Sequence, residues 1–313
     1  MAQCSKTLLL IIGPTGVGKT ELALRVAEQY GSPVVSCDSR QIYREIEIGT
    51  AAPTKKEQER VKHYFVGVKE LDEDYNAGQY ERDALTLLDQ LFNDHNIVVM
   101  TGGSMMYADA VCNGLDDLPA IPKHIRDGVR KNYETNGLAW LQAEVERLDP
   151  QYWGKVDRQN PARLMHCVEI CLTTGKAYSS LLSKKSGERP FRIIKVGLLR
   201  DRADLYARID ERVRRMVRDG LVEEAKNVYG KRKLNSLQTV GYKELFAHFD
   251  GDYDLERAIE LIQQNSRHYA KRQMTWFRRD KEIHWLDANE KYEKNISIID
   301  ALLDGDGLQA SEC

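Results

Sequence analysis

The sequence predicts an α/β fold: a parallel sheet with helices on both faces, interrupted by a mostly helical insertion. Two observations lead to this prediction. Short apolar runs alternate with helical patterns along most of the chain, and the first run leads directly into a glycine-rich loop and a helix. The alternation stops between residues 115 and 190, where the pattern is helical and contains no convincing strand.

Four apolar runs have the length and composition of buried strands, and helical patterns accompany them. The expected strands are Thr7–Ile12, Pro33–Cys37, Ile97–Thr101 and Ile193–Leu199. The expected helices are Glu21–Tyr30, Asn76–His95, Lys123–Glu134, Leu138–Leu148, Pro161–Thr174 and Tyr253–Arg279. Residues 183–187 read as a loop that returns to the sheet, and residues 305–313 as a disordered end. We therefore expect a core of residues 1–114 and 191–313 and an insertion domain of residues 115–190.

Composition narrows the function only a little. The 313 residues are 30% charged and 42% hydrophobic, as in an ordinary globular protein, and the net charge of −2 gives no global signal for nucleic acid. No segment resembles a membrane span or a signal peptide. Six cysteines without C-x-x-C spacing favour a reducing compartment over a disulfide framework or a zinc site. We expect a cytoplasmic protein that does not bind membranes.

The strongest single motif is the segment Gly13–Thr20, which fits G-x-x-x-x-G-K-[ST] in full. It lies between an apolar run and a helical pattern, where a phosphate-binding loop belongs, and it makes the expected core P-loop NTPase-like. Backbone N–H groups, the Lys19 ammonium and a Mg²⁺ held by Thr20 would then bind phosphate oxygens. The residues expected to hold phosphate are Gly13, Thr15, Gly16, Gly18, Lys19 and Thr20. The loop alone does not identify the phosphate compound.

Polar residues follow two of the expected strands. Asp38 ends the second strand, where a side chain beside a phosphate loop points into the ligand crevice, although an Asp-Ser pair is equally common as a cap of a turn. Ser104 follows Gly102-Gly103 and either donates a hydrogen bond into the same crevice or caps the next helix. The strand that ends at Thr101 lacks the terminal acid that holds Mg²⁺ in P-loop ATPases. Loss of a pyrophosphate group, with a carboxylate acting on the nucleophile, fits better than nucleotide hydrolysis.

Taken together, the motifs resemble those of tRNA dimethylallyltransferases, the isopentenyl transferases of the bacterial MiaA type. The resemblance covers nearly the whole chain, in order. Its segments are Gly13–Thr20, Asp38–Tyr43 with Ile48–Ala51, Gly102–Ser104, Gln159–Arg163, Arg208–Val213, Val240–Glu244 and Ala270–Arg278. Ser104 stands where the family usually has Thr, which keeps the hydroxyl, and Ala52 replaces a common Lys.

The resemblance implies transfer of dimethylallyl from its pyrophosphate to the exocyclic amine of the adenosine 3′ of the tRNA anticodon. Asp38 would take the proton of the amine, Ser104 would assist, and Arg212 would stabilise the leaving group with Mg²⁺. Read from the pattern alone, Arg208, Arg212 and Arg215 are typical of a solvated helix face, because they recur at helical spacing.

The same resemblance predicts an RNA surface. Arg267, Lys271 and Arg278 share one face of the long C-terminal helix, which is otherwise typical of a solvated side. Basic residues of the insertion would grip the other side of the anticodon stem-loop. The residues expected to contact tRNA are Asp38, Ser39, Gln41, Ile42, Ser104, Arg126, Arg163, Gly241, Tyr242, Lys243, Lys271, Arg272 and Arg278.

Two other classes of function remain open at this point, a small-molecule kinase and a nucleotide-switched RNA-binding protein without catalysis. The missing strand-end acid and the crevice formed by Asp38 and Gly102–Ser104 argue against both. We expect a monomer whose partners are the tRNA anticodon stem-loop and dimethylallyl pyrophosphate.

Overall fold

The computed structural model describes residues 6–116, 118–182 and 188–305. The chain divides into two compact units, Met1–Asn113 with Glu188–Cys313, and Gly114–Gly187. The predicted loop at residues 183–187 lies outside the described residues. So does the predicted disordered end, apart from Gly305, which follows the last helix.

The first unit is built on a parallel sheet with the strand order β3-β2-β4-β1-β5-β6. Its strands are β1 (Thr7–Ile12), β2 (Val34–Ser36), β3 (His63–Tyr64), β4 (Ile97–Gly102), β5 (Arg192–Leu199) and β6 (Ile283–Asp287). Its helices are α1 (Lys19–Tyr30), α2 (Glu47–Thr50), α3 (Lys55–Arg60), α4 (Ala77–Leu91), α5 (Met105–Asn113), α10 (Arg202–Arg218), α11 (Leu221–Val228), α12 (Tyr242–Phe249), α13 (Leu255–Phe277) and α14 (Tyr292–Asp304), with 3₁₀ turns η1 (Tyr229–Lys231) and η2 (Asn235–Leu237). The predicted fold class is confirmed, and β3 and β6 are strands that the sequence pattern did not predict.

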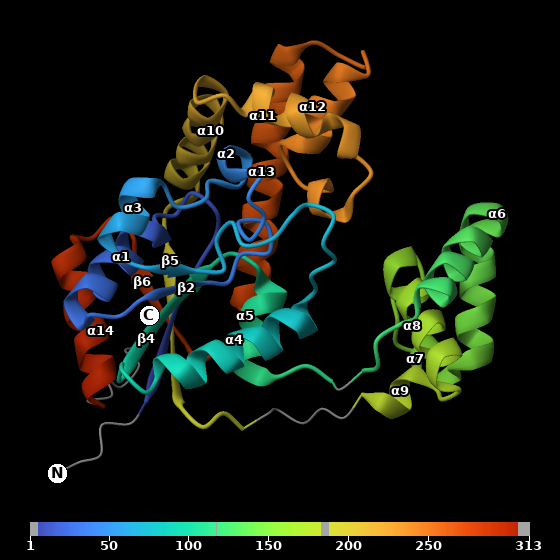
Figure 1. The fold of residues 1–313 in the computed structure, drawn as a ribbon, viewed down its shortest axis with the longest axis horizontal. Helices are drawn as coiled ribbons and strands as arrows, with labels where there is room; N and C mark the ends of the chain where they lie inside the picture. The colour runs from blue at the N-terminus through green and yellow to red at the C-terminus, as the bar shows by residue number, and fades with distance from the viewer. Residues whose placement is uncertain (1–5, 117, 183–187, 306–313) are drawn as a thin grey trace. The chain divides into compact units, whose positions relative to one another are not determined.

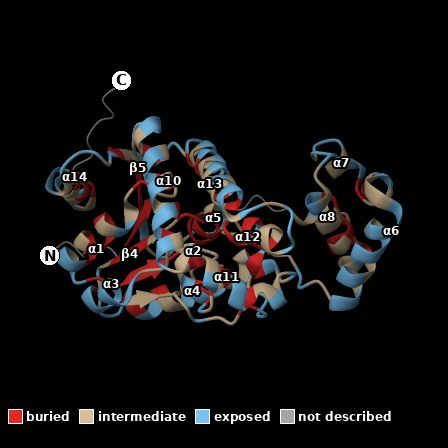
Figure 2. Ribbon diagram, turned by 90° about the horizontal axis from the view of Figure 1, so that it is seen from above, coloured by how far each residue is buried: buried red, intermediate tan, exposed pale blue. Residues whose placement is uncertain are grey.

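Helices cover both faces of this sheet, as Figure 1 shows for α1 and α14 on one side and α4 and α5 on the other. The alternation of side chains along β1 explains why both faces are apolar. Leu9 and Ile11 pack into the core with α1, α10 and α14, while Leu8 and Leu10 pack with α4 and α5. Buried residues therefore concentrate on the strands and on the inward sides of the helices (Figure 2).

The described part of the second unit contains helices and loops but no strand. It contains α6 (Lys123–Leu148), α7 (Pro150–Trp153), α8 (Pro161–Thr174) and α9 (Tyr178–Leu181) around a small apolar core of its own. The helix α6 joins the two predicted helices, but Gly137 interrupts it with φ 70° and ψ −165°, a conformation that glycine adopts readily. The prediction for α8 is confirmed to the residue, with Asn160 as its N-cap.

The sheet topology brings three polar loops to one edge. Because β2, β4 and β1 are neighbours and run parallel, their carboxyl ends meet at the same edge of the sheet. Asp38 follows β2, Gly103 follows β4, and the loop of Gly13–Thr20 follows β1. The three segments that the sequence predicts around one crevice therefore meet at this edge.

Candidate active site

The glycine-rich loop has a backbone path that residues with a side chain rarely follow. Gly13, Gly16 and Gly18 have φ values of 147°, 81° and 113°, in the region that favours glycine. Gly18 is also the N-cap of α1, so the first N–H groups of the helix open toward the loop. A helix N-terminus of this kind is a natural anion site.

Lys19 is folded back over this loop. Its Nζ donates to the carbonyl oxygens of Gly13 and Pro14, each at 2.9 Å. Burial first, and then the neighbouring charge of Arg212, lower the pKa of Lys19 to about 8. The ammonium is thus already positioned over the loop and poorly compensated, which favours an incoming anion.

Arg212 reaches the loop from α10. Its Nη1 donates to Thr15 Oγ1 at 2.8 Å, and its Nη2 lies 3.5 Å from the carbonyl oxygen of Thr50. Burial lowers its pKa, and the charge of Asp38 opposes this shift. The solvated-face interpretation therefore fails for Arg212, although Arg208 and Arg215 of the same predicted stripe are exposed.

Asp38 fulfils both interpretations of its position. Its Oδ1 accepts from the backbone N–H groups of Arg40 (2.9 Å) and Gln41 (3.3 Å), so the carboxylate caps the turn after β2. Its Oδ2 faces Gly103, since a Cβ atom added there would lie 3.8 Å from it. The charge of Asp38 also raises the pKa of Tyr269 on α13, after burial of that phenol. One oxygen is therefore structural, while the other faces the crevice.

Ser104 holds the Asp38 turn rather than pointing freely at a substrate. Its buried Oγ accepts from the N–H of Ser39 (2.7 Å) and donates to Ser39 Oγ (2.9 Å). Its carbonyl accepts from the N–H groups of Tyr107 and Ala108, as expected at the start of α5. The Ser104 hydroxyl therefore has a positioning role in this structure, and its direct part in catalysis stays a prediction.

Two residues expected to contact tRNA are instead buried in the core. Ile42 and Tyr242 are both 0% exposed, so their side chains support the site without reaching RNA. Tyr242 donates to Glu224 Oε1 (2.6 Å), and the Glu224 carboxylate also accepts from the N–H groups of Ile48 and Gly49, each at 2.8 Å. Glu224 thereby anchors the segment that carries the carbonyl of Thr50. Sequence reasoning missed Glu224, because it lies outside every motif.

Other expected tRNA contacts differ in their exposure. Gln41 donates to the carbonyl oxygen of Ala51 (2.9 Å) and supports the same segment. The exposed side chains among the expected contacts are Arg126, Arg163, Lys243, Lys271, Arg272 and Arg278. Arg126 and Arg163 belong to the helical unit, and the others to the sheet unit. Arg267 does not belong to the exposed set, because its side chain is 27% exposed, and it is also ion-paired with Asp210.

Gln273 is the other important residue that sequence reasoning left out. It lies within the Ala270–Arg278 motif but on the buried side of α13, with an exposure of 1%. Its Oε1 accepts from the N–H of Thr15 at 2.9 Å, and its Nε2 donates to the carbonyl oxygen of Gly103 at 2.8 Å. Spacing on α13 gives the signal, because residue 273 follows the inward stripe of Ile262 and Ala270.

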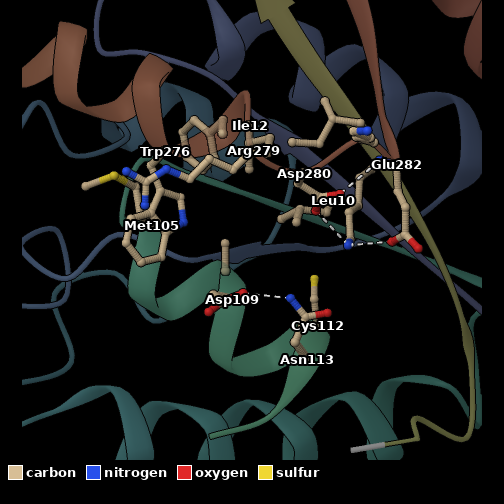
Figure 3. Close-up of a pocket in the computed structure, with 15 residues that line it drawn as sticks. Leu10, Ile12, Met105, Asp109, Cys112, Asn113, Trp276, Arg279, Asp280 and Glu282 are labelled. Carbon is tan, nitrogen blue, oxygen red and sulfur yellow. Dashed lines mark hydrogen bonds and ion pairs between the residues drawn. The ribbon is translucent and has the colours of Figure 1, made fainter. Parts of the chain in front are cut away.

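A cavity of about 450 Å³ lies beside these segments, between β1, α5 and the end of α13 (Figure 3). Ile12, Met105 and Trp276 line it. Ile12 directly precedes the phosphate loop, Met105 directly follows Ser104, and Trp276 lies one helical turn after Gln273. At its far end the buried Lys195 is paired with Asp280 and Glu282, each at 2.8 Å. Apolar residues that line the cavity are thus close in the chain to the phosphate loop, Ser104 and Gln273.

The described residues contain no group of three or more histidine, cysteine or acidic side chains placed to hold a metal ion. The four described cysteines, Cys37, Cys112, Cys167 and Cys171, are free and buried. Within the described part of the chain, no helix is long and apolar enough to cross a membrane.

Comparison with known proteins now adds to this geometry. A sequence model of the family described as IPP transferase matches residues 41–280. The chain belongs to the IPP transferase family. The match includes Ser104, Arg212 and the cations of α13, while the phosphate loop and Asp38 precede it.

Relatives of this IPP transferase are similar along almost their whole length. The tRNA dimethylallyltransferase 1 of Bacteroides fragilis is 53% identical over 289 residues, which covers 92% of this chain and 96% of that one. A crystal structure of the tRNA isopentenylpyrophosphate transferase of Bacillus halodurans aligns with a TM-score of 0.71 and 31% identity, covering 96% of each chain. A structure titled as a eukaryotic dimethylallyltransferase acting on tRNA aligns with a TM-score of 0.82 and 22% identity, covering 98% of this chain and 82% of that one. At this identity the comparison shows a similar fold.

Proposed function

We propose that this IPP transferase moves a dimethylallyl group from dimethylallyl pyrophosphate to the exocyclic amine of the adenosine 3′ of the tRNA anticodon. The observation that carries the proposal is the shared edge of the sheet, where the phosphate loop and the Asp38 carboxylate follow strands whose carboxyl ends meet. The family membership and the absence of an acid at the end of β4 support transfer over nucleotide hydrolysis. The protein acts as a monomer in this proposal.

Asp38 acts on the nucleophile. The adenine amine is a poor nucleophile because its lone pair is delocalised into the ring. As the new C–N bond forms, a proton leaves the amine, and Oδ2 of Asp38 accepts it as general base. The hydrogen bonds to Oδ1 keep the carboxylate in place during this step. Ser39 and Ser104 fix the turn from the other side.

The phosphate loop acts on the leaving group. The allylic C–O bond breaks, and its electron pair leaves with pyrophosphate, whose negative charge grows in the transition state. Lys19 and Arg212 already contact the phosphate loop, which supports a role for both in preorganised stabilisation of that charge together with the loop N–H groups.

Thr20 fits a Mg²⁺ ion. Its side chain is exposed at the start of α1, and a single hydroxyl suffices for an ion that keeps waters and phosphate oxygens as its other ligands. When bound, Mg²⁺ would neutralise part of the pyrophosphate charge.

The target base reaches Asp38 only if it leaves its stack in the anticodon loop. Proteins read RNA sequence in such single-stranded loops, where bases can be extruded into a pocket. The exposed cations Lys271 and Arg272 on α13 and Arg278 at its C-cap would bind the phosphates beside that loop, because the same helix contacts Thr15 through Gln273. Lys243, Arg126 and Arg163 would add contacts along the stem.

An end-point assay tests the proposal. The protein is incubated with dimethylallyl pyrophosphate, total tRNA and Mg²⁺, and the digested nucleosides are analysed by mass spectrometry. We expect an adenosine that carries one dimethylallyl group. A parallel reaction with ATP separates the alternative, because a phosphorylated product there and no prenylated adenosine here would indicate a kinase.

A further inference from the structure

Gln273 connects the two ends of the site. Its side-chain amide forms one hydrogen bond to the N–H of Thr15 in the phosphate loop and one to the carbonyl oxygen of Gly103 after β4. We call these two bonds the Gln273 bridge. The Gln273 side chain is buried, the bond to Gly103 is buried, and the bond to Thr15 is part-buried.

The bridge continues to Asp38 through short contacts. Gly103 is followed by Ser104, whose Oγ accepts from the N–H of Ser39 at 2.7 Å. Ser104 N–H in turn donates to the carbonyl oxygen of Cys37 at 3.2 Å. Asp38 stands between Cys37 and Ser39, so its backbone is fixed on both sides by the residue that follows Gly103.

Gly103 has room for the bridge only because it lacks a side chain. A Cβ atom there would lie 2.5 Å from Gln273 Nε2, while its next contact, Asp38 Oδ2, is at 3.8 Å. Gly103 does not have a left-handed φ, so alanine carries no backbone penalty at this position. The Gly103→Ala substitution would therefore disturb the site by displacing the Gln273 amide.

We propose that Gln273 is a positioning residue that fixes the distance between the pyrophosphate-binding loop and the Asp38 carboxylate. The inference rests on the proposed function, because that function places the leaving group at the phosphate loop and the adenosine amine at Asp38. A small change in this spacing misaligns the two reacting atoms while both substrates still bind. Gln273 then affects the rate of the chemical step more than the affinity for tRNA.

The first test compares two glutamines of α13. Gln273→Met keeps the volume and removes both hydrogen bonds. Gln263→Met is the matched control, because Gln263 donates to the carbonyl of Asp210 and not to the site. We expect kcat to fall about 10²-fold in Gln273→Met, the effect typical of misplaced reacting groups, and the Kd for inorganic pyrophosphate to rise about tenfold. The Kd for tRNA should stay within about twofold of wild type in both variants.

The second test is a double-mutant cycle. Gly103→Ala should lower kcat in the wild-type background, because it displaces the amide. In the Gln273→Ala background the same substitution should cost nothing further, because the obstructed atom is gone. Should Gln273→Met fail to fold, Gly103→Ala still tests the bridge with Gln273 in place. Gln273→Glu keeps an acceptor for the N–H of Thr15, so its kcat should lie between those of Gln273→Ala and the wild type.

Equal losses from Gly103→Ala in both backgrounds would overturn the proposal, as would wild-type kcat in Gln273→Met or a loss confined to tRNA affinity. Prenylation by the wild-type protein and pyrophosphate binding, measured by calorimetry, separate a failure of the proposed function from a failure of the Gln273 bridge. If the wild-type protein prenylates no tRNA, the proposed function fails. Unchanged pyrophosphate affinity and unchanged kcat in Gln273→Met of an active protein would contradict only the bridge.

Discussion

The pyrophosphate end and the adenosine end of the site are organised in different ways. At the pyrophosphate end, Lys19 and Arg212 already contact the loop that they serve, and both are partly buried. At the adenosine end, Asp38 uses one oxygen to hold its own turn and leaves the other facing Gly103. The cations of α13 that would meet the RNA are exposed side chains.

This difference indicates how each end works. A preorganised charged pocket stabilises a small, highly charged leaving group without rearrangement at the moment of reaction. An exposed set of cations binds a large polyanion through many weak, salt-sensitive contacts. Substitutions at the two ends should therefore change different measured quantities.

The largest effect is expected at Asp38. Asp38→Asn keeps an oxygen that can cap the turn and removes the base, so the rate of transfer should fall by about 10²–10⁴-fold. The affinity for tRNA should be unchanged in the same preparation. Single-turnover prenylation and filter binding measure the two quantities. Near-normal transfer by Asp38→Asn would remove Asp38 from the chemical step.

Arg212 should have the next largest effect, at the opposite end. Arg212→Ala removes a transition-state contact of a kind worth about 2.7–4 kcal/mol, with little change in tRNA affinity. Arg208→Ala is the matched control, because Arg208 contacts the same loop only through the carbonyl of Gly16 at 3.0 Å. If kcat/KM for dimethylallyl pyrophosphate fell more in Arg208→Ala than in Arg212→Ala, we would have assigned the wrong arginine.

Lys19 gives the pyrophosphate end a pH dependence. Because its pKa is lowered to about 8, the ammonium is present below that pH and is lost as the pH rises through it. Above about pH 8 the affinity for inorganic pyrophosphate should therefore fall by up to about tenfold per pH unit, relative to Lys19→Ala. Calorimetry across the pH range measures this fall in pyrophosphate affinity. The Lys19→Ala variant corrects for titration of the pyrophosphate itself. Parallel profiles for the two proteins would show that Lys19 does not supply the charge.

The smallest effects are expected at the exposed cations. Lys271→Ala with Arg278→Ala should reduce the slope of log affinity against log salt by about 1.4–1.8 and leave pyrophosphate binding intact. Arg257→Ala on the same helix is the control, because that side chain pairs with Glu260. An unchanged salt slope in the double variant would mean that RNA binds elsewhere, with the helical unit that carries Arg126 and Arg163 as the next candidate.

The sequence predicted the parts of the fold that short-range patterns determine. β1 and α8 match their predicted ranges, because each has an uninterrupted apolar or amphipathic pattern with clear ends. The pattern did not predict β3, which has two residues, or β6, an edge strand whose buried residues Ile283 and Leu286 are three positions apart and so lack the alternation of a typical strand. Both strands depend on pairing with a neighbour that is already formed.

The residues of the site, like the strands, divide into those that a local sequence pattern predicts and those that depend on tertiary contacts. The phosphate loop is one contiguous motif, so its residues were predictable without the structure. Gln273 and Thr15 are 258 positions apart, and no local pattern predicts that an amide on α13 bonds to that loop. The burial of Ile42 and Tyr242 likewise results from tertiary packing, which a motif cannot distinguish from direct contact with RNA.

The chemistry at the adenosine end can be tested directly with two anticodon stem-loops. One carries adenosine 3′ of the anticodon, and the other carries a purine without the exocyclic amine at that position. We predict that both bind with similar affinity and that only the first gains a dimethylallyl group from dimethylallyl pyrophosphate, at that residue. Prenylation of the amine-free stem-loop, or of a different nucleotide in the first, would contradict transfer to the adenosine amine beside Asp38.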